Sequence, residues 1–180
     1  MVTEIHGWVR VPKPLQKLKG KGTPPRAELL LRLSLQSNPE ALCLVRATVQ
    51  RATEVVPFPE AQSRAIVRSV DEALANIIRH AYKSQRGLPI ELSCWRLPPD
   101  PLSRKPGGGL EILLSDSGPP VDLAKLRGRS LEEIRPGGLG LHFMKQSMDV
   151  VEFRRKNGKN LLRMVKYLAP SKPEEKPQGD

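Results

Sequence analysis

The sequence contains few aromatic residues and few cysteines. Aromatic residues make up 4% of the 180 residues, so we expect a core built mainly from Leu, Val, Ile and Ala. The two cysteines, Cys43 and Cys94, provide neither a disulfide framework nor the spacing of a metal site, which suggests a reducing compartment. No stretch approaches the roughly 18 uncharged apolar residues of a membrane span. The N-terminus also lacks the apolar run of a signal peptide.

The charge of the chain is strongly positive, at +11, and much of the excess lies outside the expected core. Residues 1–27 are basic and are interrupted by Pro and Gly, which predicts an irregular extension. One domain is then expected over residues 28–168, followed by a polar tail over 169–180. A basic chain is compatible with a nucleic-acid partner. However, interleaved aromatic residues and a recognisable reading helix are missing, so this function ranks last.

The hydrophobic pattern predicts both strands and helices. Alternating apolar residues predict strands over 28–36, 89–97, 110–116, 150–154 and 160–168. In the first strand, Leu29, Leu31, Leu33 and Leu35 are expected to point to one side. Asn38 is expected to cap a first helix, a second helix to run through 69–82 to a stop near Gly87, and a third to follow residue 137. This order predicts an α+β fold: a two-layer α/β sandwich with a mixed, mostly antiparallel sheet and helices on one face.

Glu72 and Asn76 interrupt the pattern of a plain amphipathic helix. They are four residues apart, so they share one helix face beside an apolar stripe. A carboxylate and an amide on one face can hold a hard cation and orient an oxygen nucleophile, because both offer oxygen atoms. Taken alone, the pair is equally compatible with a solvated polar patch, since charged residues usually lie outside.

Two further stretches carry residues suited to binding a nucleotide. Asp116 and Gly118 follow a buried strand, where a carboxylate can accept a hydrogen bond from a base amine and a glycine allows close approach. Gly137, Gly138 and Gly140 precede a helix, where backbone N–H groups can contact phosphate. Each has an ordinary alternative, an Asp-containing turn in the first case and a loop with a helix cap in the second. The glycines match neither a Walker P-loop nor GxGxxG.

In this order, the three stretches resemble the N box and the two glycine boxes of the GHKL (Bergerat-fold) ATP-binding superfamily. The best match is to the small bacterial anti-sigma-factor serine/threonine kinases. The resemblance covers about residues 28–168 and rests on DEALANIIRHAY at 71–82, DSGPPVD at 116–122 and GGLGLHFMKQSMDVVEF at 137–153. A fuller first glycine box reads DxGxG, and this chain has Pro120 at the second glycine.

The resemblance implies a role for each matching residue. Asn76 would be a ligand of the Mg²⁺ that bridges the ATP phosphates, and Glu72 would be the general base. Asp116 would bind the adenine amine, with Gly118 beside it. The nucleotide would also contact the second glycine box, which comprises Gly137, Gly138, Leu139, Gly140 and Leu141. Residues 119–136 would form a lid over ATP, and His80 would have a structural role near the site.

The resemblance also implies function and partners. The protein would be a cytoplasmic protein kinase that phosphorylates a STAS-domain anti-anti-sigma protein and sequesters a sigma factor, with a homodimer as a further assembly. The main alternative is an ATP-binding switch that sequesters a partner without kinase activity. The intact Glu72 and Asn76 pair favours the enzyme, because a protein that only binds needs no base.

Overall fold

A computed structural model describes residues 27–99, 107–121 and 139–169. Its sheet has five strands in the order β1-β2-β3-β5-β4, and all four pairings are antiparallel. The strands are β1 (Glu28–Gln36), β2 (Pro89–Leu97), β3 (Gly109–Asp116), β4 (Val150–Lys156) and β5 (Lys159–Tyr167). The predicted fold class is confirmed, and no parallel pairing occurs among the described strands.

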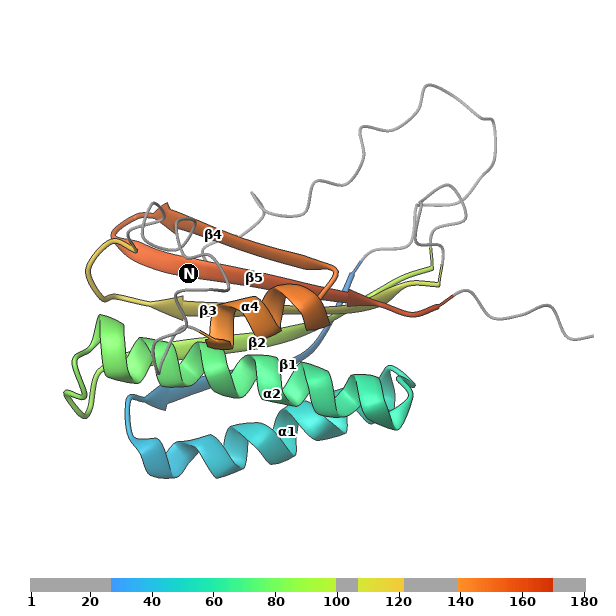
Figure 1. Ribbon diagram of the computed structural model, residues 1–180, viewed down its shortest axis with the longest axis horizontal. Helices are drawn as coiled ribbons and strands as arrows, with labels where there is room; N and C mark the ends of the chain where they lie inside the picture. The colour runs from blue at the N-terminus through green and yellow to red at the C-terminus, as the bar shows by residue number, and fades with distance from the viewer. Residues whose placement is uncertain (1–26, 100–106, 122–138, 170–180) are drawn as a thin grey trace, which may run out of the picture.

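The helices cover one face of this sheet (Figure 1). A short 3-10 helix, η1 (Pro39–Ala41), leads into α1 (Leu42–Val55). Helix α2 (Glu60–Asn76) continues as a π-helical segment, η2 (Ile77–Ala81), and α4 (Leu139–Ser147) packs beside α2. None of the described helices is both long and apolar enough to cross a membrane.

The hydrophobic core lies between the helices and the sheet. Val49 of α1, Leu74 of α2 and Met144 of α4 meet Leu92 and Ile112 of the sheet, and all five are at most 1% exposed. Their spacing explains the two element types, since apolar residues recur every three or four positions in the helices and every second position in the strands. The predicted Leu, Val, Ile and Ala core is therefore present, with methionine added.

The first strand differs from its prediction at one residue. The β1–β2 register shifts between Leu29 and Leu31, so that Leu29 faces Trp95 whereas Leu31 faces Cys94. Successive residues of a strand point to opposite faces, so a bulge of one residue reverses the side chains that precede it. Leu29 is consequently 42% exposed, and the expectation that it shares a face with Leu31 is wrong.

Two helix boundaries also differ from the prediction. Asn38 precedes η1, as expected, but its side chain makes no capping hydrogen bond. The second helix ends at Ala81 rather than near Gly87. The chain reverses instead through Lys83 and Ser84, two non-glycine residues with positive φ angles of 49° and 62°.

Candidate functional site

Glu72 and Asn76 lie on α2, one helical turn apart, and both are half-buried. The opposite side of α2 anchors the helix, because Ile66, Val70 and Leu74 are at most 2% exposed. The carboxylate of Glu72 takes part in no hydrogen bond or ion pair with any described residue. Its neighbour Asp71, in contrast, forms an ion pair with Arg46 of α1. The structure therefore leaves Glu72 available for chemistry while Asp71 is already paired.

The N-terminal end of α4 lies against Glu72. A Cβ atom at Gly140 would clash with the Oε2 atom of Glu72 and would lie 3.1 Å from its Cδ atom. The same two helices are joined by Arg68, whose guanidinium carbon is 4.1 Å from the centre of the Phe143 ring. The absence of a side chain at Gly140 thus leaves room for the Glu72 carboxylate, and the first and third sequence stretches lie side by side here.

The rest of the second glycine box is only partly visible. Gly137, Gly138 and the side chain of Leu139 lie outside the described residues, as does most of the predicted lid over 119–136. Leu141 is half-buried and packs against the hydrophobic core.

A π-helical segment directly follows Asn76. In η2 the hydrogen bonds span five residues or more, as shown by Tyr82 N donating to Ile77 O at 2.8 Å. Such segments occur often at functional sites, where the extra residue widens a turn and redirects side chains. His80 lies exposed on this segment, so the packing role expected for it is not observed.

Asp116 ends β3 and is 6% exposed. Its Oδ1 atom accepts hydrogen bonds from the backbone N–H of Gly118 and from Nδ2 of Asn160, each at 2.8 Å. Its Oδ2 atom accepts none from the described residues. Gly118 is also tightly placed, since a Cβ there would lie 2.8 Å from Cβ of Ala81 and 2.9 Å from Oδ1 of Asp116. The second stretch therefore packs against the end of the helix that carries the first.

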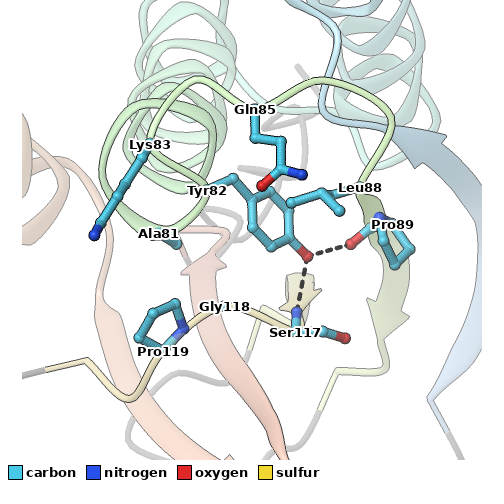
Figure 2. Close-up of a pocket in the computed structure, with 9 residues that line it drawn as sticks. All are labelled: Ala81, Tyr82, Lys83, Gln85, Leu88, Pro89, Ser117, Gly118 and Pro119. Carbon is cyan, nitrogen blue, oxygen red and sulfur yellow. Dashed lines mark hydrogen bonds between the residues drawn. The ribbon is translucent and has the colours of Figure 1, made fainter.

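Tyr82 joins these two segments by its hydroxyl group, as Figure 2 shows. The hydroxyl donates a hydrogen bond to Pro89 O at 2.6 Å and accepts one from the backbone N–H of Ser117 at 2.8 Å. Burial raises the pKa of Tyr82 above its ordinary value, and the charge of Asp116 acts in the same direction. The phenol consequently stays protonated and can serve as a donor at neutral pH.

An open pocket of about 410 Å³ lies at this junction (Figure 2). It is lined by residues from the end of η2, the start of β2 and the loop after β3: Ala81, Tyr82, Lys83, Gln85, Leu88, Pro89, Ser117, Gly118 and Pro119. Within this lining Ala81 and Gly118 lie close together, since a Cβ atom at Gly118 would lie 2.8 Å from that of Ala81 and 2.9 Å from Oδ1 of Asp116. The pocket is thus adjacent to the candidate base-binding carboxylate.

The site offers few metal ligands of its own. No group of three or more His, Cys, Asp or Glu side chains that could hold a metal ion exists within residues 27–99, 107–121 and 139–169. Mg²⁺ does not require such a group, because it usually binds one or two protein oxygens together with substrate phosphates and water. The half-buried amide of Asn76 fits that requirement, since its side chain has no hydrogen bond to a described residue.

Sequence reasoning did not identify three residues of this site. Tyr82 belongs to the motif at 71–82, but nothing in the motif indicates that its hydroxyl accepts a hydrogen bond from the backbone N–H of Ser117. Asn160 and Arg155 flank the Asn157-Gly158 turn, and their contacts depend on which residues face one another across β3, β5 and β4. That pairing does not follow from the sequence, although Asn157-Gly158 between two apolar runs predicts the hairpin itself, which the structure confirms.

Comparison with known proteins identifies relatives of the whole domain. The histidine kinase-like ATPase domain family matches residues 35–166. The chain is 24% identical over 147 residues to the serine-protein kinase RsbW of Bacillus pumilus, covering 77% of this chain and 86% of that protein. It is 26% identical over 153 residues to the serine-protein kinase RsbW of Listeria innocua, covering 81% and 91%.

A further relative is the serine/threonine-protein kinase BtrW of Bordetella bronchiseptica. It is 30% identical over 104 residues, which cover 56% of this chain and 67% of that protein. The family match includes Glu72, Asn76, Asp116 and Gly140, the described residues to which the resemblance assigns the main roles. The fold and the comparisons agree, and the chain belongs to the histidine kinase-like ATPase domain family of the GHKL superfamily.

Proposed function

We propose that this protein is an ATP-dependent serine/threonine protein kinase that acts as an anti-sigma factor. The observation that supports kinase activity best is the state of Glu72. It is half-buried, it lies against Gly140 at the start of α4, and it has no ion pair among the described residues. A carboxylate kept in this way can accept a proton, whereas a protein that only binds ATP needs no base at that position.

In the proposed reaction, Glu72 accepts the proton of a Ser or Thr hydroxyl as its oxygen attacks the γ-phosphorus of ATP. The bond between that oxygen and phosphorus forms, the bond between the γ-phosphorus and the β–γ bridging oxygen breaks, and ADP leaves. Asn76 would hold Mg²⁺, which neutralises the phosphate charge when bound. Asn76 shares a helix face with Glu72, which supports a metal ligand close to the proposed base.

Base recognition is assigned to Asp116 in this proposal. Two donors hold its Oδ1 atom, and Oδ2 remains as an acceptor for the amine of adenine. The loop after Asp116 can approach a ligand closely because Gly118 has no side chain.

The proposed acceptor is a STAS-domain anti-anti-sigma protein, and the proposed sequestered partner is a sigma factor. Relatives named as serine-protein or serine/threonine-protein kinases support a hydroxyl acceptor. The specific partners, the cytoplasmic location and a homodimer follow from the family resemblance and are part of the proposal.

A pair of matched substitutions on α2 tests the proposal. Glu72→Gln removes a charge without changing size, so phosphoryl transfer to the STAS partner should fall about 10²- to 10⁴-fold, the usual contribution of a positioned base. Asp71→Asn makes the same change one residue earlier, where the carboxylate is paired with Arg46, and should leave transfer nearly unchanged. Transfer of radiolabelled phosphate and Mg-ATP affinity are measured on the same preparations.

Three results are informative here. Retained ATP binding with lost transfer in Glu72→Gln supports the kinase. Wild-type protein that binds ATP and partner but never labels the partner, with Glu72→Gln behaving identically, favours the switch that sequesters a partner without catalysis. Wild-type protein that binds no nucleotide in the presence of Mg²⁺ contradicts both functions.

A further inference from the structure

Three polar residues form a row across the end of the sheet. Asp116 of β3 faces Asn160 of β5, and Asn160 faces Arg155 of β4. Asp116 and Asn160 are 6% and 5% exposed, whereas Arg155 lies at the exposed tip of the hairpin. A buried polar pair needs hydrogen-bond partners to be tolerated, so the contacts of Asn160 can be accounted for atom by atom.

The amide nitrogen of Asn160 faces three acceptor oxygens. Nδ2 lies 2.8 Å from Oδ1 of Asp116, 2.9 Å from Pro119 O and 3.3 Å from Gly118 O. Its two hydrogens are directed to the two nearest acceptors, Asp116 and Pro119. The orientation of the amide follows from these surroundings, because the opposite orientation would place its oxygen against three other oxygens.

Arg155 completes the set on the other side. Its NH1 nitrogen donates to Oδ1 of Asn160 at 2.7 Å and to Gly118 O at 3.0 Å. The Gly118 carbonyl, which lies farthest from the Asn160 amide, therefore has its own donor. Among the described residues, the side-chain oxygens of Asp116 and Asn160 and the carbonyls of Gly118 and Pro119 each have a donor, with the exception of Oδ2 of Asp116.

We infer that Asn160 and Arg155 are positioning residues for nucleotide recognition. Asn160 holds Oδ1 of Asp116 and the Pro119 carbonyl, and Arg155 fixes Asn160 and the Gly118 carbonyl. Together they orient Oδ2 of Asp116 as an acceptor for a base amine. This inference rests on the proposed nucleotide binding, and it assigns to the β4–β5 hairpin a part in base selection.

The consequence for selectivity is specific. A nucleotide with an amine at position 6 of the purine can donate to Oδ2, whereas inosine diphosphate has a carbonyl there and cannot. If Asn160 no longer held Asp116, ADP would lose this contact and bind more weakly, whereas the affinity for inosine diphosphate would change little. The ratio of the two affinities therefore reports the orientation of Asp116, and a general loosening of the fold would weaken both ligands alike.

Asn160→Asp provides an isosteric test. It places a second carboxylate beside Oδ1 of Asp116, so the two groups must repel or share a proton. We expect ADP affinity, relative to wild type at each pH, to be near normal at about pH 5 and to fall about 10- to 100-fold by about pH 8, as the shared proton is lost. The preference for ADP over inosine diphosphate should shrink over the same range.

Arg155 and its neighbour provide the control. Arg155→Gln should weaken the binding of ADP more than that of inosine diphosphate. The effect should be smaller than in the Asn160 variant, since Asn160 keeps its contacts with Asp116 and Pro119. Arg154→Gln removes the same charge from the same hairpin, but Arg154 faces Leu161 instead of Asn160 and forms an ion pair with Glu152 of its own strand. Equal effects of the two arginine substitutions would indicate a general electrostatic attraction of nucleotide and would exclude a positioning role for Arg155.

A measurement without ligand separates this inference from the proposed function. The N–H of Gly118 donates to Oδ1 of Asp116, so its hydrogen exchange reports whether Asp116 is held. In the full-length protein without nucleotide, exchange at Gly118 should be faster in Asn160→Leu than in wild type. The inference is overturned if exchange at the Gly118 amide is the same in Asn160→Leu as in wild type. It is also overturned if the preference of Asn160→Asp for ADP over inosine diphosphate depends on pH no more than that of wild type. Nucleotide binding by wild type is scored separately and decides only the proposed function.

Discussion

At the scale of single residues, the site is shaped by where side chains are missing. Gly140 and Gly118 have ordinary backbone conformations, so neither is required by a positive φ angle. Each instead leaves room for a neighbour, which is the carboxylate of Glu72 in one case and both Ala81 and Asp116 in the other. Glycine at these two positions thus leaves the space that the carboxylates of Glu72 and Asp116 occupy.

Gly140→Ala should separate activity from stability. Alanine favours a helix over glycine by about 1 kcal/mol, so the free energy of unfolding should stay the same or rise slightly. The new Cβ would nevertheless displace the end of the Glu72 side chain, which is flexible and can move at low cost. We expect phosphoryl transfer at saturating ATP to fall while thermal unfolding is unchanged.

The double substitution gives the control for this prediction. In a Glu72→Gln background, Gly140→Ala should cause little further loss of transfer, because both changes act on one group. Losses that multiply would show that Gly140 contributes through something other than Glu72, for example the phosphate contact expected from the family resemblance.

At the scale of elements, strand register decides more of the site than helix periodicity does. The β4–β5 turn, with φ angles of 49° at Asn157 and 77° at Gly158, sets Arg155 opposite Asn160. A two-residue turn with both φ angles positive matches the twist of the adjoining strands and fixes their pairing. Because a slip of one residue would turn Asn160 away from Asp116, this turn is coupled to the candidate base-binding site.

Gly158→Ala should reveal this coupling when compared with Gly87→Ala. Both glycines have positive φ angles, of 77° and 78°, and a Cβ at either position would meet nothing within 4 Å. Each substitution should therefore cost only backbone strain, about 1 kcal/mol of the free energy of unfolding. Exchange at the Gly118 amide should quicken in Gly158→Ala alone. Equal exchange at the Gly118 amide in the two variants would show that the conformation of the Asn157-Gly158 turn does not affect the 116–119 loop.

At the scale of the whole molecule, much of the architecture could be predicted from the sequence. The bounds of β1 and β2 agree with their alternating patterns, and the Asn-Gly turn was placed correctly. The family resemblance assigns Glu72, Asn76, Asp116 and Gly140 to one nucleotide site, and this assignment stays a prediction, although Gly140 does lie against Glu72. Local patterns carried these predictions, since the residues concerned lie within continuous motifs.

The remaining features depend on contacts that no local pattern contains. The bulge that exposes Leu29 reflects a shift in pairing with β2, and alternation within β1 alone does not indicate it. The π-helical segment η2 differs from an α-helix by one residue in the span of its hydrogen bonds, and its five residues are too few to change a hydrophobic period. The roles of Tyr82, Arg155 and Asn160 require knowing which strand lies beside β3.

The charge of the molecule is unevenly distributed along the chain, and this leads to the last prediction. Residues 1–26 contain six Lys or Arg and one Glu, a net charge of +5 out of +11. They lie outside the described residues, and the family match begins only at residue 35. All contacts of the candidate site described above come from residues 46–160. Deleting residues 1–26 should therefore leave the affinity for Mg-ADP unchanged in calorimetry.

The same deletion should affect any binding to polyanions. Attraction of basic residues to a polyanion depends steeply on salt, through the release of counterions, and scales with the number of cations in contact. Binding of the full chain to heparin or DNA, if measured at low salt, should weaken on deletion and lose part of its salt dependence, while the nucleotide site is unaffected. A large loss of Mg-ADP affinity would instead show that residues 1–26 contribute to the nucleotide site. Unchanged polyanion binding would instead assign that binding to the rest of the chain, since residues 27–180 retain a net charge of +6.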